Sequence, residues 1–172
     1  MNILEQIAAQ TRERIEAEKR QTPTEELIRQ IEAMEQKKSK QSFYEALKKP
    51  GMSYICEVKK ASPSKGLIAS DFPYLDIARE YEAAGASAIS CLTEPFRFLG
   101  KDAYLQEIAA QVEIPVLRKD FTVDEYMIYQ ARLLGASAVL LICAILDDAQ
   151  LRAYRELAES LGMDALVEAH DE

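Results

Sequence analysis

One stretch of the sequence decides the fold class, Gly135-Ala136-Ser137-Ala138-Val139-Leu140-Leu141-Ile142-Cys143. It opens on a glycine of the kind that ends a helix and continues into Val139-Leu140-Leu141-Ile142, which is apolar throughout. A strand without polar alternation is typical of a parallel sheet that is covered on both faces. A similar stretch, Gly85-Ala86-Ser87-Ala88-Ile89, lies fifty residues earlier between another predicted helix and strand. Two strand–helix units therefore span fifty residues, which predicts a repeated architecture.

The rest of the chain after Gly51 alternates in the same way between short apolar runs and segments of helical period. We predict strands at Tyr54–Lys59, Ala88–Thr93, Pro115–Lys119, Ala138–Cys143 and Ala165–Ala169, and helices at Pro73–Ala84, Ala103–Val112, Asp124–Leu134 and Asp148–Leu161. A capping box at Thr122–Glu125 and an N-cap at Asp147 mark the starts of the last two helices. Alternating strands and helices with right-handed crossovers imply a parallel α/β sheet.

The first fifty residues contain helical patterns and no predicted strand. We predict an amphipathic helix over residues 2–20, a second helix that opens at a Thr22–Glu25 capping box with Pro23 in its first position, and a short helix that opens at a Ser42–Glu45 capping box. The run Lys37–Lys40 is interpreted as a solvated face or linker. We therefore divide the chain into an N-terminal helical extension, residues 1–50, and a strand–helix region, residues 51–172.

The composition is that of an ordinary globular chain, with 172 residues, 48% hydrophobic and 29% charged. No run approaches the ~18 apolar residues of a membrane span, and early charges argue against a secretory segment. A net charge of −8 disfavours binding to nucleic acid or to a membrane surface, but an anionic small molecule can bind where positive charge gathers. Three cysteines, Cys56, Cys91 and Cys143, have no metal or redox spacing and are interpreted as buried free thiols. We expect a soluble, cytoplasmic protein.

Periodicity alone leaves two architectures open. Five strand–helix units fit a doubly wound, five-stranded open sheet. They also fit the first part of an eight-unit barrel, which needs ~200–250 residues and would here be truncated after its fifth strand.

Charged residues gather at the predicted strand ends, where parallel α/β folds place their sites. Glu57 and Lys59 share one face of the first strand, Lys119 ends the third, and Glu168 lies in the fifth. Because an unpaired buried charge is costly, these groups form either an acid–base cluster or a set of stabilising ion pairs.

The same residues carry a resemblance to a known family. Glu57-Val58-Lys59-Lys60-Ala61-Ser62-Pro63-Ser64-Lys65-Gly66 resembles the first strand and loop of indole-3-glycerol-phosphate synthase. Cys91-Leu92-Thr93-Glu94 with Phe98-Leu99-Gly100 resembles its second, Pro115–Phe121 its third and Leu166-Val167-Glu168 its fifth. The resemblance implies a (βα)8 barrel, here truncated to five strands, with residues 1–50 as the family's N-terminal extension. It implies conversion of 1-(2-carboxyphenylamino)-1-deoxyribulose 5-phosphate to indole-3-glycerol phosphate in tryptophan biosynthesis, without a cofactor or metal.

The resemblance also implies roles for four charged residues. Lys119 would be the general acid that protonates the substrate carbonyl, and Glu168 would assist dehydration. Lys59 would pair with anionic groups of the substrate and serve as an alternative proton donor, and Glu57 would hold Lys59 and shape the proton network. Arg118 should point to the opposite face of its strand and be structural.

Apolar residues would complete the site under the same resemblance. Pro63, Phe98, Phe121, Leu140 and Ile142 would line the slot for the aromatic ring, with plain core packing as the alternative for each. Ser62 begins a loop over residues 62–66 that would be either a mobile lid or an ordinary exposed loop. His170, Asp171 and Glu172 are interpreted as solvated terminal residues.

A chain truncated after strand five has two expected consequences. Phosphate-binding barrels hold the phosphate on loops after strands seven and eight, so we expect little activity from this chain alone. Two exposed sheet edges predict self-association. Two alternatives stay open: another phosphate-binding barrel enzyme of the tryptophan pathway, and a non-catalytic five-stranded α/β module.

Overall fold

The computed structural model describes residues 2–34, 42–68 and 70–170. The run Lys37–Lys40 and the terminal pair Asp171 and Glu172, for which the sequence predicts solvated positions, lie outside the described residues. The helices are α1 (Ile3–Gln21), α2 (Thr24–Ala33), α3 (Phe43–Leu47), α4 (Tyr74–Ala83), α5 (Asp102–Gln111), α6 (Glu125–Leu133) and α7 (Asp148–Ser160). The strands are β1 (Ile55–Val58), β2 (Ala61–Ser62), β3 (Gly66–Leu67), β4 (Ala88–Leu92), β5 (Val116–Lys119), β6 (Ala138–Ile142) and β7 (Asp164–Glu168).

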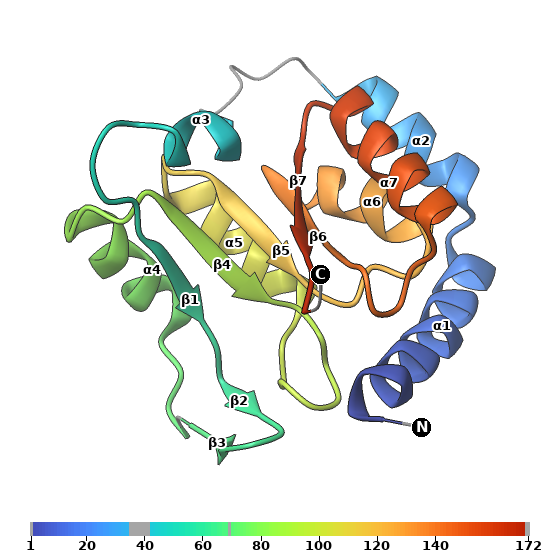
Figure 1. Ribbon diagram of the computed structural model, residues 1–172, viewed down its shortest axis with the longest axis horizontal. Helices are drawn as coiled ribbons and strands as arrows, with labels where there is room; N and C mark the ends of the chain where they lie inside the picture. The colour runs from blue at the N-terminus through green and yellow to red at the C-terminus, as the bar shows by residue number, and fades with distance from the viewer. Residues whose placement is uncertain (1, 35–41, 69, 171–172) are drawn as a thin grey trace.

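The main sheet consists of five parallel strands that lie side by side in the order of the chain, β1-β4-β5-β6-β7 (Figure 1). The order of strands in a doubly wound sheet reverses at a switch point, whereas a (βα)8 barrel adds each strand beside the last. Sequential order therefore identifies the barrel type of architecture and excludes the doubly wound alternative. The parallel α/β prediction is confirmed, and the strands are placed to within a residue or two.

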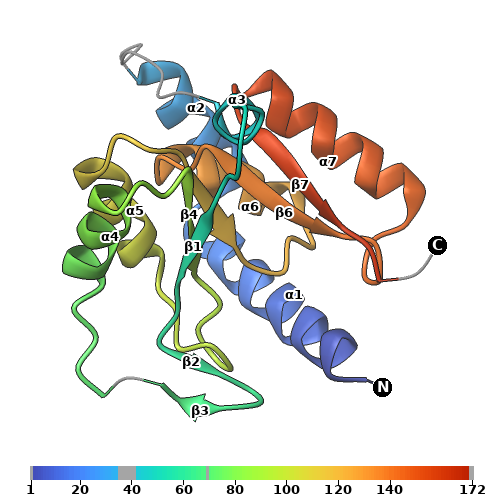
Figure 2. The ribbon, with the colours of Figure 1, turned by 60° about the vertical axis from the view of Figure 1, so that its left-hand side comes forward.

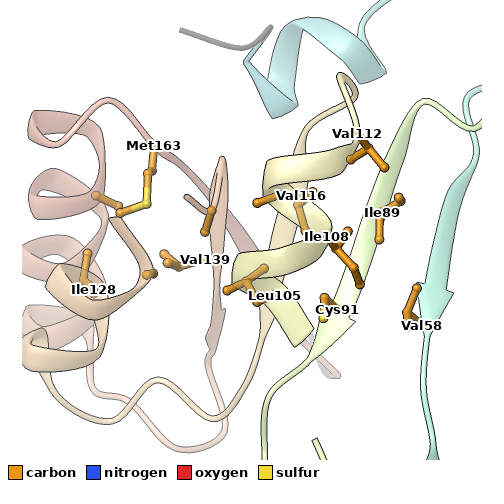
Figure 3. Close-up of a cluster of buried hydrophobic side chains, with 14 of the residues drawn as sticks. Val58, Ile89, Cys91, Leu105, Ile108, Val112, Val116, Ile128, Val139 and Met163 are labelled. Carbon is orange, nitrogen blue, oxygen red and sulfur yellow. The ribbon is translucent and has the colours of Figure 1, made fainter. Parts of the chain in front are cut away.

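Helices α4 to α7 cover one face of this sheet (Figures 1 and 2). Side chains that alternate along the strands, including Ile89, Val116 and Val139, point into a core shared with Leu105 and Ile108 of α5 (Figure 3). These five side chains are almost completely buried. Because β4 and β6 are buried at every position, their apolar runs match the pattern that parallel strands require.

The opposite, inner face of the sheet is covered by helices of the first fifty residues. Phe43 of α3 packs against Ala88, Leu117 and Ala138 near the amino ends of the strands. Ile7 of α1 packs on the inner face near their carboxyl ends. Helix α2 contributes to a further cluster with α1 and α6. The division at residue 50 stays a prediction, and these contacts bind the two parts closely.

The predicted helix ends are partly confirmed. Gly85 and Gly135 follow the last residues of α4 and α6 with φ of +89° and +85°, the left-handed geometry expected after a helix. Asp147 caps α7 in a reciprocal capping box with Gln150. Ser42 caps α3 by accepting from the Glu45 N–H.

Two predicted capping boxes are wrong. Thr22 ends α1 instead of opening α2, which begins at Thr24 with Pro23 in the capping position. Thr122 does not cap α6, because Asp124 lies closer to the helix and accepts from the Tyr126 N–H at 2.9 Å. The sequence also missed a hairpin in residues 61–67, where β2 and β3 pair antiparallel.

Candidate functional site

Four charged side chains from three strands meet on the inner face, at the carboxyl ends of the sheet. Glu57 and Lys59 come from β1 and the residue after it, Lys119 from the end of β5 and Glu168 from the end of β7. Residues two apart in a strand point to the same face, which puts Glu57 and Lys59 together. The sheet register places Lys119 beside Leu92, and Glu168 beside Ile142. The sequence-predicted catalytic residues are therefore neighbours.

The four groups form a row of alternating charge with unequal spacing. Lys59 Nζ lies 2.8 Å from Glu57 Oε1, which is a close ion pair. Lys119 Nζ lies 3.9 Å from Glu57 Oε2 and 4.0 Å from Glu168 Oε2, beyond hydrogen-bond length. The side chains of all four are about one-third exposed. Lys59 is thus held closely by its partner, whereas Lys119 lies between two carboxylates and forms a longer ion pair with each.

An apolar wall lies close to the row, formed by Phe98, Phe121, Leu140 and Ile142. The rings of Phe98 and Phe121 have centroids 6.2 Å apart and planes inclined by 39°. Phe121, Leu140 and Ile142 are each less than 10% exposed, whereas Phe98 is partly buried. Apolar side chains beside charged groups, two of them aromatic, suit an aromatic ligand that carries anionic substituents.

Two other predicted site residues lie in the β2–β3 hairpin. Pro63 is exposed in the turn and does not belong to the buried apolar cluster. Ser62 is buried, and its hydroxyl accepts from the Lys65 N–H at 3.2 Å, so it stabilises the turn. The structure therefore brings four of the six predicted substrate-binding residues together and leaves these two apart.

Sequence reasoning missed the contribution of α1 to the wall. Ile7 is 2% exposed and packs in the same cluster as Phe121, Leu140 and Ile142, with Leu4 partly buried beside it. The helical spacing of apolar residues in α1 was a usable signal for a buried face, but it did not indicate which surface that face would cover.

It also missed Glu94, whose carboxylate organises the loop after β4. The side chain of Glu94 accepts from the N–H groups of Phe96, Arg97 and Phe98 at 2.8, 2.7 and 2.9 Å. The residue is completely buried, and the same loop ends at Gly100, packed against the backbone of β4. A carboxylate that accepts several N–H bonds is a strong local constraint. Glu94 therefore determines where Phe98 lies.

Arg118 and His170 lie near the site, and only His170 differs in part from its predicted place. Arg118 points away from Lys119, as expected, and is buried with Nη2 2.8 Å from Asp102 Oδ1. His170 is exposed, as expected, but its Nε2 lies 2.8 Å from Glu168 Oε1 and so contacts the charged row.

The cysteines also match in part, since Cys91 alone is fully buried and Cys56 and Cys143 are partly exposed. Burial raises the pKa of the Cys91 thiol to about 12. Among the residues that the structure describes, no group of three or more His, Cys, Asp or Glu side chains could hold a metal ion. No described helix is both long and apolar enough to span a bilayer.

The geometry can be set beside known proteins. The sequence model of one family, Indole-3-glycerol phosphate synthase, matches residues 4–172. This chain belongs to the indole-3-glycerol phosphate synthase family. Proteins named indole-3-glycerol phosphate synthase are 53% identical to it in Ruminiclostridium cellulolyticum, 55% in Endomicrobium trichonymphae and 54% in Lacticaseibacillus paracasei. The matches cover 99%, 99% and 98% of this chain.

Membership of the indole-3-glycerol phosphate synthase family agrees with the observed sheet. The family has the (βα)8 barrel fold, and five parallel strands in sequential order are the first five strands of such a barrel. The chain spans 65%, 66% and 64% of the length of the three relatives. The matched region includes the charged row and the apolar wall.

Proposed function

We propose that residues 1–172 provide the acid–base groups and the ring-binding wall of an indole-3-glycerol phosphate synthase acting in tryptophan biosynthesis in the cytoplasm. The substrate would be 1-(2-carboxyphenylamino)-1-deoxyribulose 5-phosphate, which carries a carboxylate and a phosphate. The observation that carries the proposal is the position of Lys119, 3.9 and 4.0 Å from two carboxylates and close to an apolar wall. Family membership supports the same reaction.

Lys119 would act as the general acid of ring closure. The ring carbon that bears the carboxylate attacks the ketone carbon, and the ammonium of Lys119 gives its proton to the ketone oxygen. The new carbon–carbon bond is followed by loss of the carboxylate as CO2, which restores the aromatic ring. Loss of water then breaks the C–O bond of the new hydroxyl and the C–H bond of the adjacent carbon, which bears the nitrogen. Lys59 would protonate the leaving hydroxyl, and Glu168 would take the proton from that carbon. The 4.0 Å between Glu168 and Lys119 allows this proton to return to Lys119. No cofactor takes part in these steps.

Lys59 and Glu57 would orient the substrate and not start the reaction. The 2.8 Å pair keeps the Lys59 ammonium near the site, where it can attract an anionic group of the substrate. Glu57 lies between Lys59 and Lys119, and its negative charge reduces the repulsion between the two ammonium groups. Phe98, Phe121, Leu140 and Ile142 would hold the aromatic ring, with Pro63 and Ser62 reaching it only if the hairpin moves.

We propose that phosphate binding depends on parts of the barrel outside these residues. In phosphate-binding barrels, the loops after strands seven and eight hold the phosphate, whereas the sheet described here has five strands. The chain alone should therefore turn over the substrate slowly. The outer edges of β1 and β7 have no neighbouring strand among those described, so the same proposal includes self-association through these edges.

Turnover of the substrate, followed by the fluorescence of the indole product, tests the proposal. The chain is assayed alone and as a chimera in which it replaces the matching part of the Ruminiclostridium cellulolyticum relative. In the chimera, Lys119→Met should lower kcat about 10²–10⁴-fold, the range for loss of a general acid. Lys101→Met is the matched control, since the Lys101 ammonium lies over the ring of Tyr104.

Two results would count against the function. Unchanged turnover in the Lys119→Met chimera would remove Lys119 from the chemistry. A folded but inactive chimera, assayed beside an active relative, would show that these residues do not form a competent site.

A further inference from the structure

We propose that Arg14 of α1 is a positioning residue, which acts through the buried carboxylate of Asp120 to hold α1 against the apolar wall and to hold the segment that carries Lys119. The inference rests on the proposed function, because Lys119 and the wall obtain their roles there. It adds a residue from the first helix to the requirements of the site.

Asp120 joins three parts of the molecule through one carboxylate. Its Oδ2 accepts from Arg14 Nη2 at 3.1 Å and from Thr93 Oγ1 at 2.7 Å, and its Oδ1 accepts from the Phe121 N–H at 2.8 Å. Arg118 Nη2 lies 3.8 Å from Oδ2. The side chain is 0% exposed. A carboxylate held at both oxygens and shut off from water has little freedom to move.

Arg14 supplies the charge that α1 directs at this carboxylate. Its side chain is 13% exposed. Burial lowers its pKa, but the charge and hydrogen bond of Asp120 outweigh that effect and leave the pKa above its ordinary value. The Nε atom is buried without a hydrogen-bond partner, 3.8 Å from Glu18 Oε1. The guanidinium therefore donates to Asp120 through Nη2, while its Nε–H makes no hydrogen bond. Removing it would leave a buried charge without its main partner.

The contact between Arg14 and Asp120 lies beside the proposed site at both of its ends, in α1 and in the segment after β5. Asp120 directly follows β5 and stands between Lys119, its last residue, and Phe121, so fixing Asp120 fixes the backbone of both neighbours. Along α1, Ile7 precedes Arg14 by seven residues, which is two helical turns and the same face. Ile7 packs against the wall that includes Phe121. One ion pair therefore sets the distance between the helix and the wall.

Two further polar contacts join α1 to α6 beyond Arg14. Lys19 Nζ is 2.6 Å from Asp124 Oδ2, and the Gln130 side-chain amide donates to Glu18 at 2.6 Å. Both attach the end of α1 to α6. The side chains of Lys19 and Asp124 are more than a quarter exposed, so water screens that pair more than it screens Arg14 and Asp120.

The experiment compares this chain with Arg14→Met, which keeps side-chain length and removes the charge. Arg12→Met is the matched control, because Arg12 is exposed on the same helix. Methyl NMR of Ile7, Leu140 and Ile142 reports the packing of helix on wall, and titration with anthranilate reports ring binding. Arg14→Met should shift the three methyl signals and weaken anthranilate binding roughly five-fold, a typical size for coupling through a packed network. Arg12→Met should change neither, and Arg14→Lys should recover part of the affinity because it restores the charge.

The outcomes separate positioning from plain stabilisation. A folded Arg14→Met chain with parent-like methyl signals and affinity would overturn the inference, even with a lower melting temperature. If that variant does not fold, Arg14→Met with Asp120→Asn removes both charges. Parent-like methyl signals in this double variant would overturn the inference equally. If the parent itself does not bind anthranilate, the ring site of the proposed function fails, and the methyl signals alone decide on Arg14.

Discussion

Replacing Glu94 by Gln should destabilise the chain measurably, although the two side chains have the same shape. Glu94 Oε2 accepts from the N–H groups of Arg97 and Phe98, and Oε1 accepts from that of Phe96. The amide oxygen of Gln can occupy the first position and keep two bonds, which leaves its NH2 group facing the Phe96 N–H. The reverse orientation keeps one bond and loses two, so the first is preferred.

The magnitude follows from that choice. One charge-assisted hydrogen bond is lost, at about 1.5–3 kcal/mol, and the two that remain lose their charge assistance. Relief from burying a charge offsets part of this loss. We therefore expect Glu94→Gln to lower the free energy of unfolding by about 2–3 kcal/mol, a value that combines these terms.

Urea unfolding followed by circular dichroism measures this free energy. Glu80→Gln is the matched control, since Glu80 is exposed on α4 and should change stability by less than about 0.5 kcal/mol. Anthranilate binding adds a functional readout, because a loosened loop releases Phe98 from the wall. A Glu94→Gln chain within about 0.5 kcal/mol of the parent would refute the reasoning, since three hydrogen bonds to a buried carboxylate cannot be weakened at so small a cost.

Three further predictions concern other parts of the chain. Gly100→Ala should prevent the loop after β4 from closing, because a Cβ there would lie 2.5 Å from the Leu92 carbonyl oxygen; thermal unfolding should show a lower melting temperature. Cys91 should resist thiol reagents at pH 8 while Cys56 and Cys143 react, as mass spectrometry of labelled peptides would show. The pKa of the Cys91 thiol is raised from 9.0 to about 12, so the stability that the neutral thiol contributes is complete below pH 9 and is lost as the pH rises toward 12. Cys91→Ala should therefore flatten the curve of unfolding free energy against pH in that range. Sedimentation should show species larger than one 19.4 kDa chain, and a monomer at all concentrations would contradict self-association through β1 and β7.

The sequence pattern was sufficient for the strands, for their parallel direction and for the edge of the sheet where the charged row lies, for the same physical reason. Apolar runs such as Val139–Ile142 require cover on both faces, and parallel strands bring their carboxyl ends to one edge. Glu57, Lys119 and Glu168 all occupy that edge, so strand polarity and two-residue alternation bring them together without any knowledge of contacts. The capping rules gave a wrong N-cap where two suitable residues lie close together: Asp124, and not Thr122, caps α6.

What the sequence could not predict depends on pairs that are far apart in the chain. Arg14 and Asp120 are 106 residues apart in the sequence. The residues around Arg14 resemble those around any solvated charge on a helix, and those around Asp120 resemble any segment after a strand. Periodicity alone also leaves the order of the strands open, because it is the same in a doubly wound sheet and in a barrel; only the family resemblance predicted the order of a barrel. In a sheet with sequential strand order, helices α4 to α7 all lie on one face (Figure 2). The apolar side chains of the inner face must therefore pack against other parts of the chain. Helices α1 and α3 provide that cover, with Ile7 at one end of the strands and Phe43 at the other. Helices α1 and α3 are therefore part of the core, and α1, which covers the carboxyl ends of the strands, also forms part of the candidate site.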